Sequence, residues 1–424
     1  MISILMKFSG LGFSLITAVI LARHLGPEQY GHYSFALAIV SILAIPAMFG
    51  LPNLLVRETA KAETLRDWGT MRGLWSWANR VTLVLSISLM VLFLSALWLY
   101  QDASKFDEPM LFVWAALFIP LSALAALRSA SLRGLKKVIQ GQLPEQIIKP
   151  VCFVTMLLAV VVVGQYELDA EQAMLFNVLA TSVAFIAGAW LLMKAKPNQM
   201  FGVERKYQSK EWALSVIPLA LISGLEVIVT QSDIVMIGIF STAYDVGIYR
   251  VAMQGAVLAS VGIAAVNMVM APHYTKLFNE NDIDGLRKLS VSGARFSIVI
   301  SLFVFLIMFF HGEFILDIFF GEEYVEALSV LLILVFAQVM HAAGGSGGMM
   351  LIMCGYEKGT LITLLLAAIL NLILNYIFIP MWGVDGAAFA TGISVFIRKV
   401  VIWIMVYRKF RIDTSIFGIL FTKQ

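Results

Sequence analysis

The stretch "LARHLGPEQYGHYSFALA" (residues 21–38) places a polar turn between two long apolar runs. A weaker copy of this turn, "FSTAYDVGIYRVAM" (residues 240–253), returns in the second half of the chain. The copies align after a shift of 216 residues, which superposes Gly31 on Gly247 and Tyr33 on Tyr249. The same shift brings the polar segments that follow each turn into register, so the sequence predicts a fold built from two similar halves.

The composition is that of a membrane protein. Hydrophobic residues make up 60% of the 424 residues, and the mean hydropathy is +0.88. The charged fraction of 13% is about half of that in soluble domains. A membrane-spanning helix needs roughly 20 apolar residues, and by this measure the sequence predicts an all-α chain of twelve transmembrane helices. These begin near residues 1, 33, 79, 110, 147, 173, 212, 246, 291, 325, 360 and 385.

Basic residues gather in alternate loops. The loops on one side of the predicted bundle hold most of the Lys and Arg, whereas those on the other side hold only Arg23 and Lys105. By the positive-inside rule, we expect both termini to be cytoplasmic. A wrong helix count would scramble this alternation, so the charges support twelve helices independently of hydropathy.

The repeat predicts two lobes of six helices, residues 1–205 and 206–424. Because six is even, both lobes must have the same orientation, and we expect a pseudo-twofold axis along the membrane normal. Transporters of this construction carry their substrate path at the interface between the repeats. The sequence therefore predicts a carrier whose two lobes rock by alternating access.

Two acids lie inside one predicted span. Ser223, Glu226, Thr230 and Asp233 are spaced by three, four and three residues, which puts them on one helical face. A charge at mid-bilayer costs about 2.5–3.5 kcal/mol on insertion scales. A polar seam between helices would explain the two hydroxyls but explains the acids poorly. Glu226 and Asp233 are our candidates for binding a coupling ion, either a proton or sodium.

Three arginines are candidates for binding an anionic substrate. Arg23 and Arg250 lie in the two copies of the turn, on the side that is otherwise poor in basic residues, and Arg57 lies at the inner end of the second helix. Guanidinium groups match diphosphate oxygens. The alternative is that these long side chains only extend to the membrane surface.

Several other classes of site are not indicated. The chain has no GxxxxGK[ST] motif, and "GGSGG" (344–348) lies inside a predicted helix, where it fits close packing or a hinge. The five His are scattered without the spacing of metal ligands, so we expect no metal and no cofactor. The two Cys are far apart and favour no disulfide framework. The first 22 residues lack the features of a signal peptide and are interpreted as a retained helix.

Three stretches resemble a known family. The stretch 21–60 resembles the opening signature of the Wzx-like polysaccharide biosynthesis flippases, and "LRGLKKVIQGQLPEQIIKP" (132–150) and "WGVDGAAFATGISV" (382–395) are similar to further parts of that pattern. The family shares a superfamily with multidrug extruders and the lipid II flippase. The resemblance implies an inverted V of two lobes in the bacterial inner membrane. Members usually carry a polar segment before the first helix, so we expect that this chain begins late.

The resemblance also implies a function. Such proteins move undecaprenyl-diphosphate-linked oligosaccharide from the cytoplasmic to the outer leaflet, binding the diphosphate in a cationic cavity and using an ion gradient. Arg23 and Arg57 lie in the matched first block, while Arg250 rests on the repeat. The implied partners are the lipid-linked oligosaccharide and the bilayer, with a polysaccharide polymerase as a candidate; no nucleic acid is expected.

Two alternatives stay open. A cation-coupled drug extruder would carry an acid in the first helix of a lobe, and the first predicted helix has none. A membrane enzyme, such as a glycan polymerase or ligase, would need a catalytic loop on the outer side. The longest such loop, around residues 311–325, is short and has no Lys or Arg to hold a diphosphate. We therefore expect a flippase and no enzymatic activity.

Overall fold

The computed structural model describes residues 2–99, 108–163 and 168–418, so Lys105 lies outside the described part. Within those ranges the chain is helical and contains no strand. It divides into two compact units, Met1–Gln231 and Ser232–Gln424. This division falls inside a helix, whereas the sequence predicts a lobe boundary in the loop after residue 205.

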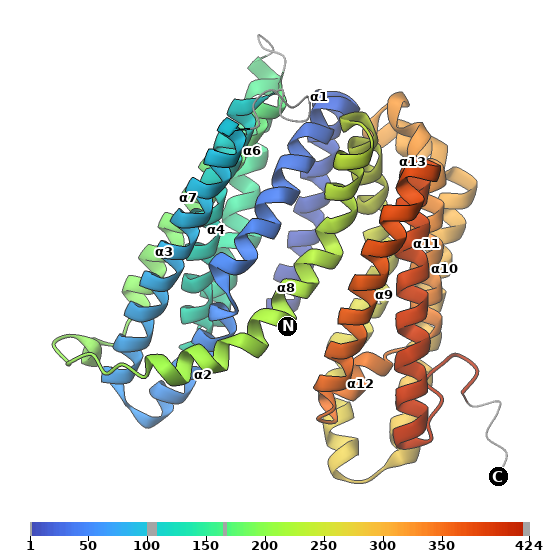
Figure 1. Ribbon diagram of the computed structural model, residues 1–424. Coiled ribbons are helices and arrows are strands. Elements are labelled where there is room, and N and C mark those ends of the chain that lie inside the picture. The colour runs from blue at the N-terminus through green and yellow to red at the C-terminus, as the bar shows by residue number, and fades with distance from the viewer. Residues whose placement is uncertain (1, 100–107, 164–167, 419–424) are drawn as a thin grey trace. The chain divides into compact units, whose positions relative to one another are not determined.

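The first unit is organised around one small-residue helix. Its elements are α1 (Ile2–Met48), α2 (Leu51–Leu65), α3 (Trp68–Leu99), α4 (Pro109–Gly134), α5 (Val138–Leu143), a π-helical turn η2 (Pro144–Ile148), α6 (Lys149–Val163), α7 (Ala170–Ala195), η3 (Asn198–Met200) and most of α8 (Ser209–Phe240). Helix α4 packs against α1, α2, α3 and α7 (Figure 1). Its alanines at 115, 116, 123 and 130 are fully buried, and such small residues let helix backbones approach closely in membranes.

The second unit contains the remaining helices. These are α9 (Ala243–Asn279), α10 (Ile283–Phe320), η4 (Glu322–Ala327), α11 (Leu328–Ala343), α12 (Gly347–Met353) and α13 (Glu357–Phe410). Helix α11 packs against α9, α10 and α13 (Figure 1). Side chains define two of the helix starts: Thr242 and Asp245 form a capping box at α9, and Asp282 accepts a bond from the Gly285 N–H at α10.

The described part of the chain holds ten helices that are long and apolar enough to cross a membrane. Two of them are broken by glycines with positive φ: α1 at Gly26 (φ 70°, ψ 171°) and α13 at Gly383 (φ 56°, ψ −134°). Glycine is favoured there because it lacks the Cβ that makes positive φ costly. When α1 and α13 are each counted as two spans, the total is the predicted twelve.

The prediction that "GGSGG" lies inside a helix is wrong. Its first three residues, 344–346, separate α11 from α12, and Gly345 has φ 70°. The carbonyls at this helix end need partners from outside the helix, and residues distant in sequence supply them. The Ile416 N–H donates to the Ala343 oxygen at 3.2 Å, the Thr414 hydroxyl to the Gly344 oxygen at 3.3 Å, and the Lys399 ammonium to the Gly345 oxygen at 2.7 Å. Lys399 of α13 and the tail after α13 therefore cap the break.

Candidate functional site

The three predicted arginines belong to different helices. Arg23 lies in α1 and is exposed. Arg57 lies in α2, where its Nε is 2.9 Å from a carboxylate oxygen of Glu58, and its side chain is 54% exposed. Arg250 lies in the first turns of α9 in the second unit and is half-buried. A role for these arginines in binding substrate stays a prediction.

The two predicted acids lie seven residues apart on α8 but have different surroundings. Glu226 is exposed, and its backbone carbonyl accepts a hydrogen bond from the Thr230 hydroxyl. Asp233 is 2% exposed and enclosed by residues of the second unit. The helical face predicted from the spacing is therefore exposed at Glu226 and buried at Asp233.

The Asp233 carboxylate accepts hydrogen bonds from three side chains. One oxygen accepts from the Tyr249 hydroxyl at 2.8 Å and from the Thr391 hydroxyl at 2.6 Å. The other accepts from the Asn375 amide at 2.6 Å. Tyr249 comes from α9, whereas Asn375 and Thr391 come from the two halves of α13. A buried carboxylate is tolerated only with such partners.

A second layer of polar groups holds these donors in place. The Asn371 carbonyl oxygen accepts from Asn375 at 3.1 Å and from the Ser232 hydroxyl at 3.2 Å, and the Asn371 amide donates to Thr391 at 3.1 Å. The side-chain oxygen of Asn375 is buried and has no hydrogen-bond partner among the described residues. The cluster thus combines a carboxylate with neutral oxygens, the ligands that hard cations prefer.

The neutral members of this Asp233 cluster are not among the residues predicted from the sequence. Asn371 and Asn375 are four residues apart inside an apolar span, so they lie on one helical face. That pair is the signal by which the sequence could have revealed them. A neutral amide in a span is a weaker indication than a charged side chain, and only the charged residues led to predicted sites.

The first unit has a related but uncharged arrangement. Tyr33, which the repeat aligns with Tyr249, accepts a hydrogen bond from the Asn177 amide of α7 at 2.7 Å. The Thr181 hydroxyl donates to the Asn177 backbone oxygen at 2.7 Å. The position that the shift of 216 residues aligns with Asp233 holds Thr17. The carboxylate is therefore present in only one copy of the repeat.

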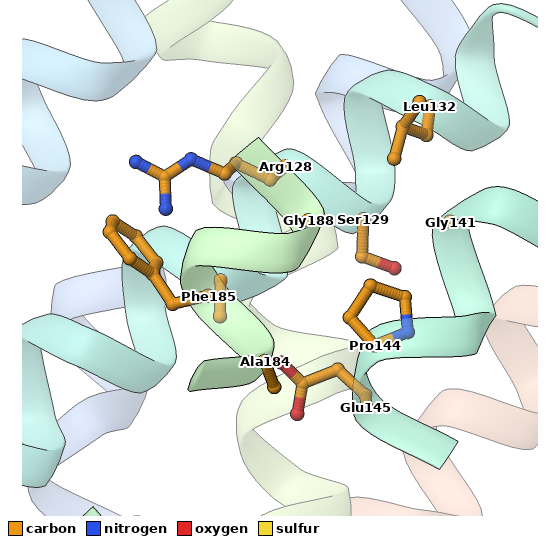
Figure 2. A pocket seen from close by; sticks show the side chains of 10 residues that line it. Arg128, Ser129, Leu132, Gly141, Pro144, Glu145, Ala184, Phe185 and Gly188 are labelled. Atoms are coloured by element: carbon orange, nitrogen blue, oxygen red, sulfur yellow. The ribbon is translucent and has the colours of Figure 1, made fainter. Parts of the chain in front are cut away.

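A small pocket lined by polar residues lies in the first unit, between α4, the α5–η2 segment and α7. Figure 2 shows the Arg128 guanidinium against the Phe185 ring, with Ser129, Pro144 and Glu145 also lining the pocket. The guanidinium carbon is 3.2 Å from the ring centroid, in the geometry of a cation–π contact. Its buried Nη1 has no hydrogen-bond partner among the described residues. Arg128 lies within α4.

The sequence pattern of the polysaccharide biosynthesis protein family matches residues 1–278, more than half of the chain. The chain belongs to this family. A second pattern, that of the MatE family, matches residues 218–377. The membership agrees with the resemblance found in the quoted sequence blocks.

Two relatives of this chain come from different organisms. It is 25% identical over 393 residues to the probable low-salt glycan biosynthesis flippase Agl15 of Haloferax volcanii, with 92% of this chain and 79% of the relative covered. It is also 25% identical over 241 residues to the capsular polysaccharide biosynthesis protein CapF of Staphylococcus aureus. That match covers 56% of this chain and 61% of CapF.

Solved structures share the fold of this chain. An inward-facing multidrug resistance MATE family transporter of the MOP superfamily aligns with a TM-score of 0.74 at 15% identity, covering 95% of this chain and 94% of the other. The lipid II flippase MurJ in an inward closed conformation aligns with a TM-score of 0.70 at 14% identity, covering 100% and 94%. The protein therefore has the fold of multi-pass membrane transporters.

Proposed function

We propose that this protein is a flippase that carries undecaprenyl-diphosphate-linked oligosaccharide from the cytoplasmic to the outer leaflet of the inner membrane. It works by alternating access between two lobes of six helices, with both termini cytoplasmic. The observation that carries this proposal is the family match over residues 1–278. The near full-length similarity to a protein named as a glycan biosynthesis flippase supports it.

Three arginines bind the diphosphate in this proposal. Arg23 and Arg57 lie in the sequence block that resembles the family signature, and Arg250 occupies the second copy of the turn. Arg23 is exposed, and Arg57 is more than half exposed. Guanidinium groups offer planar, bidentate donors to phosphate oxygens. An exposed arginine can exchange its water contacts for such an oxyanion.

Asp233 couples transport to an ion gradient in this proposal. Three donors hold its carboxylate, and one of them, Asn375, has a side-chain oxygen with no hydrogen-bond partner in the described part of the chain. A proton on Asp233, or a sodium ion among these oxygens, would change which side chains donate and which accept. Because Tyr249 and Thr391 come from different helices, that change would alter the contact between α9 and α13. Glu226 is the second coupling residue in this proposal.

Reconstitution tests the proposed function. The purified full-length chain is placed in liposomes with a fluorescent undecaprenyl-diphosphate oligosaccharide, and the accessibility of the label to an external quencher is followed with and without a proton or sodium gradient. We expect translocation that the gradient accelerates, with protein-free liposomes as the control. If the lipid-linked oligosaccharide does not move under any gradient, the proposal is wrong.

A cation-coupled drug extruder is the second candidate. The MatE pattern match over residues 218–377 favours it. The same liposomes distinguish the two functions when they are loaded with a cationic dye. Gradient-driven dye efflux in the absence of lipid translocation would establish the extruder and exclude the flippase.

A further inference from the structure

The break in α13 at Gly383 brings residues from both sides of it into one pocket. Two aromatic residues before the break and three residues after it form the lining: Phe378, Trp382, Asp385, Phe389 and Ile393. The pocket has a volume of about 590 Å³, within the range of ligand pockets. A Cβ on Gly386 would clash with the carbonyl oxygen of Phe378, so this glycine lets the two halves of α13 approach closely. The whole lining belongs to one helix of the second unit.

The three aromatic rings of the pocket are in contact with one another. The ring centroids of Phe378 and Trp382 are 4.8 Å apart, and Trp382 meets Phe389 in an edge-to-face arrangement at 6.1 Å. Trp382 is 51% exposed and Phe389 is 44% exposed, so part of each ring is open to a ligand. The face of an aromatic ring is electron-rich and attracts groups with a partial or full positive charge.

Asp385 is the one charged residue in this lining. Its Oδ1 accepts a hydrogen bond from the Ser329 hydroxyl of α11 at 2.8 Å, which holds the carboxylate in place. Its Oδ2 has no hydrogen-bond partner within the described ranges and can accept one from a ligand. Since no Lys or Arg lines the pocket, a phosphate group would be repelled there. The pocket therefore suits a ligand that offers hydroxyl donors and C–H faces.

The pocket lies at the end of two spans. The break divides α13 into two parts of nearly equal length, from Glu357 to Trp382 and from Val384 to Phe410. At 1.5 Å per residue, each part is about 40 Å long, which exceeds the roughly 30 Å of a bilayer's hydrocarbon core. The break therefore lies at the membrane surface. With the C-terminus cytoplasmic, as proposed, this is the outer surface.

We infer that this pocket binds a sugar ring of the substrate's oligosaccharide. The inference rests on the proposed function and adds a site for the glycan to the arginines proposed for the diphosphate. A pyranose ring has C–H faces that stack on aromatic rings and hydroxyl groups that donate to a carboxylate. The glycan is also the part of the substrate that must end outside the membrane, on the side where the proposed topology places the pocket.

Two other interpretations of the pocket have different requirements. An organic cation is attracted to aromatic faces and to a carboxylate, and it is the ligand that a drug extruder would carry. An interfacial anchor would explain Trp382, because tryptophan is enriched at the membrane surface, but it would not explain an acid in the same lining. The sugar is favoured because the proposed substrate supplies it and because it uses both the rings and Asp385.

Binding of a lipid-free glycan tests the inference. The probe is the oligosaccharide released by mild acid from the lipid-linked glycan of the organism that makes this protein, so it has neither diphosphate nor tail. Saturation-transfer-difference NMR measures its binding to the full-length protein in detergent. We expect binding by the wild type and about tenfold weaker binding by Trp382→Leu, because a stacked ring contact is lost.

Trp190→Leu is the matched control. Trp190 is also 51% exposed, but it lies in α7 and outside the pocket, so we expect its replacement to leave glycan binding unchanged. The inference would be overturned if the wild type showed no saturation transfer, or if Trp382→Leu bound the glycan as well as the wild type does. An anchoring role for Trp382 predicts this second result.

Asp385→Asn separates a sugar site from a cation site. The amide keeps an acceptor for the Ser329 hydroxyl but has no charge. We expect glycan binding to fall by no more than about fivefold, because a neutral acceptor remains for a sugar hydroxyl. Tetraphenylphosphonium is the second probe. Binding of this cation that Asp385→Asn abolishes, together with no glycan binding by the wild type, would overturn the assignment to a sugar.

The liposome assay distinguishes failure of this inference from failure of the proposed function. We expect Trp382→Leu to raise about tenfold the concentration of lipid-linked oligosaccharide that gives half-maximal flipping. If the wild type translocates no lipid-linked oligosaccharide, the proposed function is wrong. If the wild type translocates it and Trp382→Leu shows the same dependence on substrate concentration, the sugar site alone is refuted.

Discussion

Tyr33 and Tyr249 occupy the same place in the two copies of the repeat and have different partners. Tyr33 accepts a hydrogen bond from the neutral Asn177 side chain. Tyr249 donates to Asp233, which also accepts from Thr391 and Asn375. Both rings are buried, at 5% and 0% exposure. One copy of the turn is therefore joined to a neutral residue and the other to a charge.

The difference between the two copies indicates which polar contact the fold requires and which one is a candidate for transport. A hydrogen bond between a buried tyrosine and an amide is sufficient to join neighbouring helices. A buried carboxylate adds a desolvation cost that good packing does not require. Since the first copy does without the charge, the fold itself does not need it, and the carboxylate in the second copy is the better candidate for a role in transport.

Among the variants that test this comparison, replacement of Asp233 has the largest expected effect on flipping. We expect Asp233→Asn to abolish the acceleration of flipping by an ion gradient, because the amide cannot be protonated and carries no charge for a cation. The loss of hydrogen bonds to a charged group, about 1.5–3 kcal/mol each, corresponds to at least roughly tenfold in rate or affinity. Liposome translocation with and without the gradient measures the effect.

The aligned position in the first unit supplies the control. Thr17→Val removes a hydroxyl without removing a charge, and we expect gradient-stimulated flipping to persist. If Asp233→Asn retained full stimulation, or if Thr17→Val lost it, the functional difference between the two copies would be refuted.

The two arginines of the repeated turn give the next largest effect. We expect Arg23→Ala combined with Arg250→Ala to abolish measurable binding of polyprenyl diphosphate, since each lost charge-assisted bond costs about 1.5–3 kcal/mol. Titration calorimetry in detergent measures the affinity. The double lysine variant is the control: it keeps both charges and should retain part of the affinity. Undiminished binding by the double alanine variant would place the diphosphate site elsewhere.

The tyrosines themselves test the comparison at the level of single hydrogen bonds. We expect Tyr249→Phe to lower the free energy of unfolding by about 1.5–3 kcal/mol and Tyr33→Phe by about 0.5–1.5 kcal/mol, because Tyr249 bonds to a carboxylate whereas Tyr33 bonds to the neutral Asn177 amide. Denaturant unfolding in detergent gives both values. Gradient stimulation should weaken only in Tyr249→Phe, and equal behaviour of the two variants would remove the distinction between the copies.

Glu226→Gln has the smallest expected effect on stability. The residue is exposed, so we expect the unfolding free energy to change by less than about 0.5 kcal/mol. If Glu226 takes part in coupling, the pH dependence of flipping should become shallower in this variant. An unchanged pH profile at normal expression would leave Asp233 as the only coupling acid of α8 in our proposal.

The spans and the repeat could be predicted from the sequence because they depend on local properties. Apolar length, loop charge and the glycine turns are all visible within short windows, and they led to the twelve spans. The helical period correctly placed Asp233 on a polar face of α8. It could not separate the buried Asp233 from the exposed Glu226, because burial depends on which helix packs against each turn.

The pairing of Asp233 with its partners was beyond local patterns. Asn375 and Thr391 are 142 and 158 residues away from it in the chain, and their side chains are neutral. The interruption at "GGSGG" was missed for a similar reason. A glycine run in an apolar span is compatible with either a continuous helix or a break, and the partners that favour the break come from the end of the chain.

The cap on that break has a consequence for how the protein is made. The Gly344 carbonyl receives its hydrogen bond from Thr414, 70 residues later in the sequence, and the Ala343 carbonyl receives one from Ile416. During synthesis, α11 and α12 leave the ribosome well before these donors exist. The second unit can therefore reach its final form only after translation has nearly ended. In a chain stalled on the ribosome near the last helix, the carbonyls of Ala343 and Gly344 would still lack these donors.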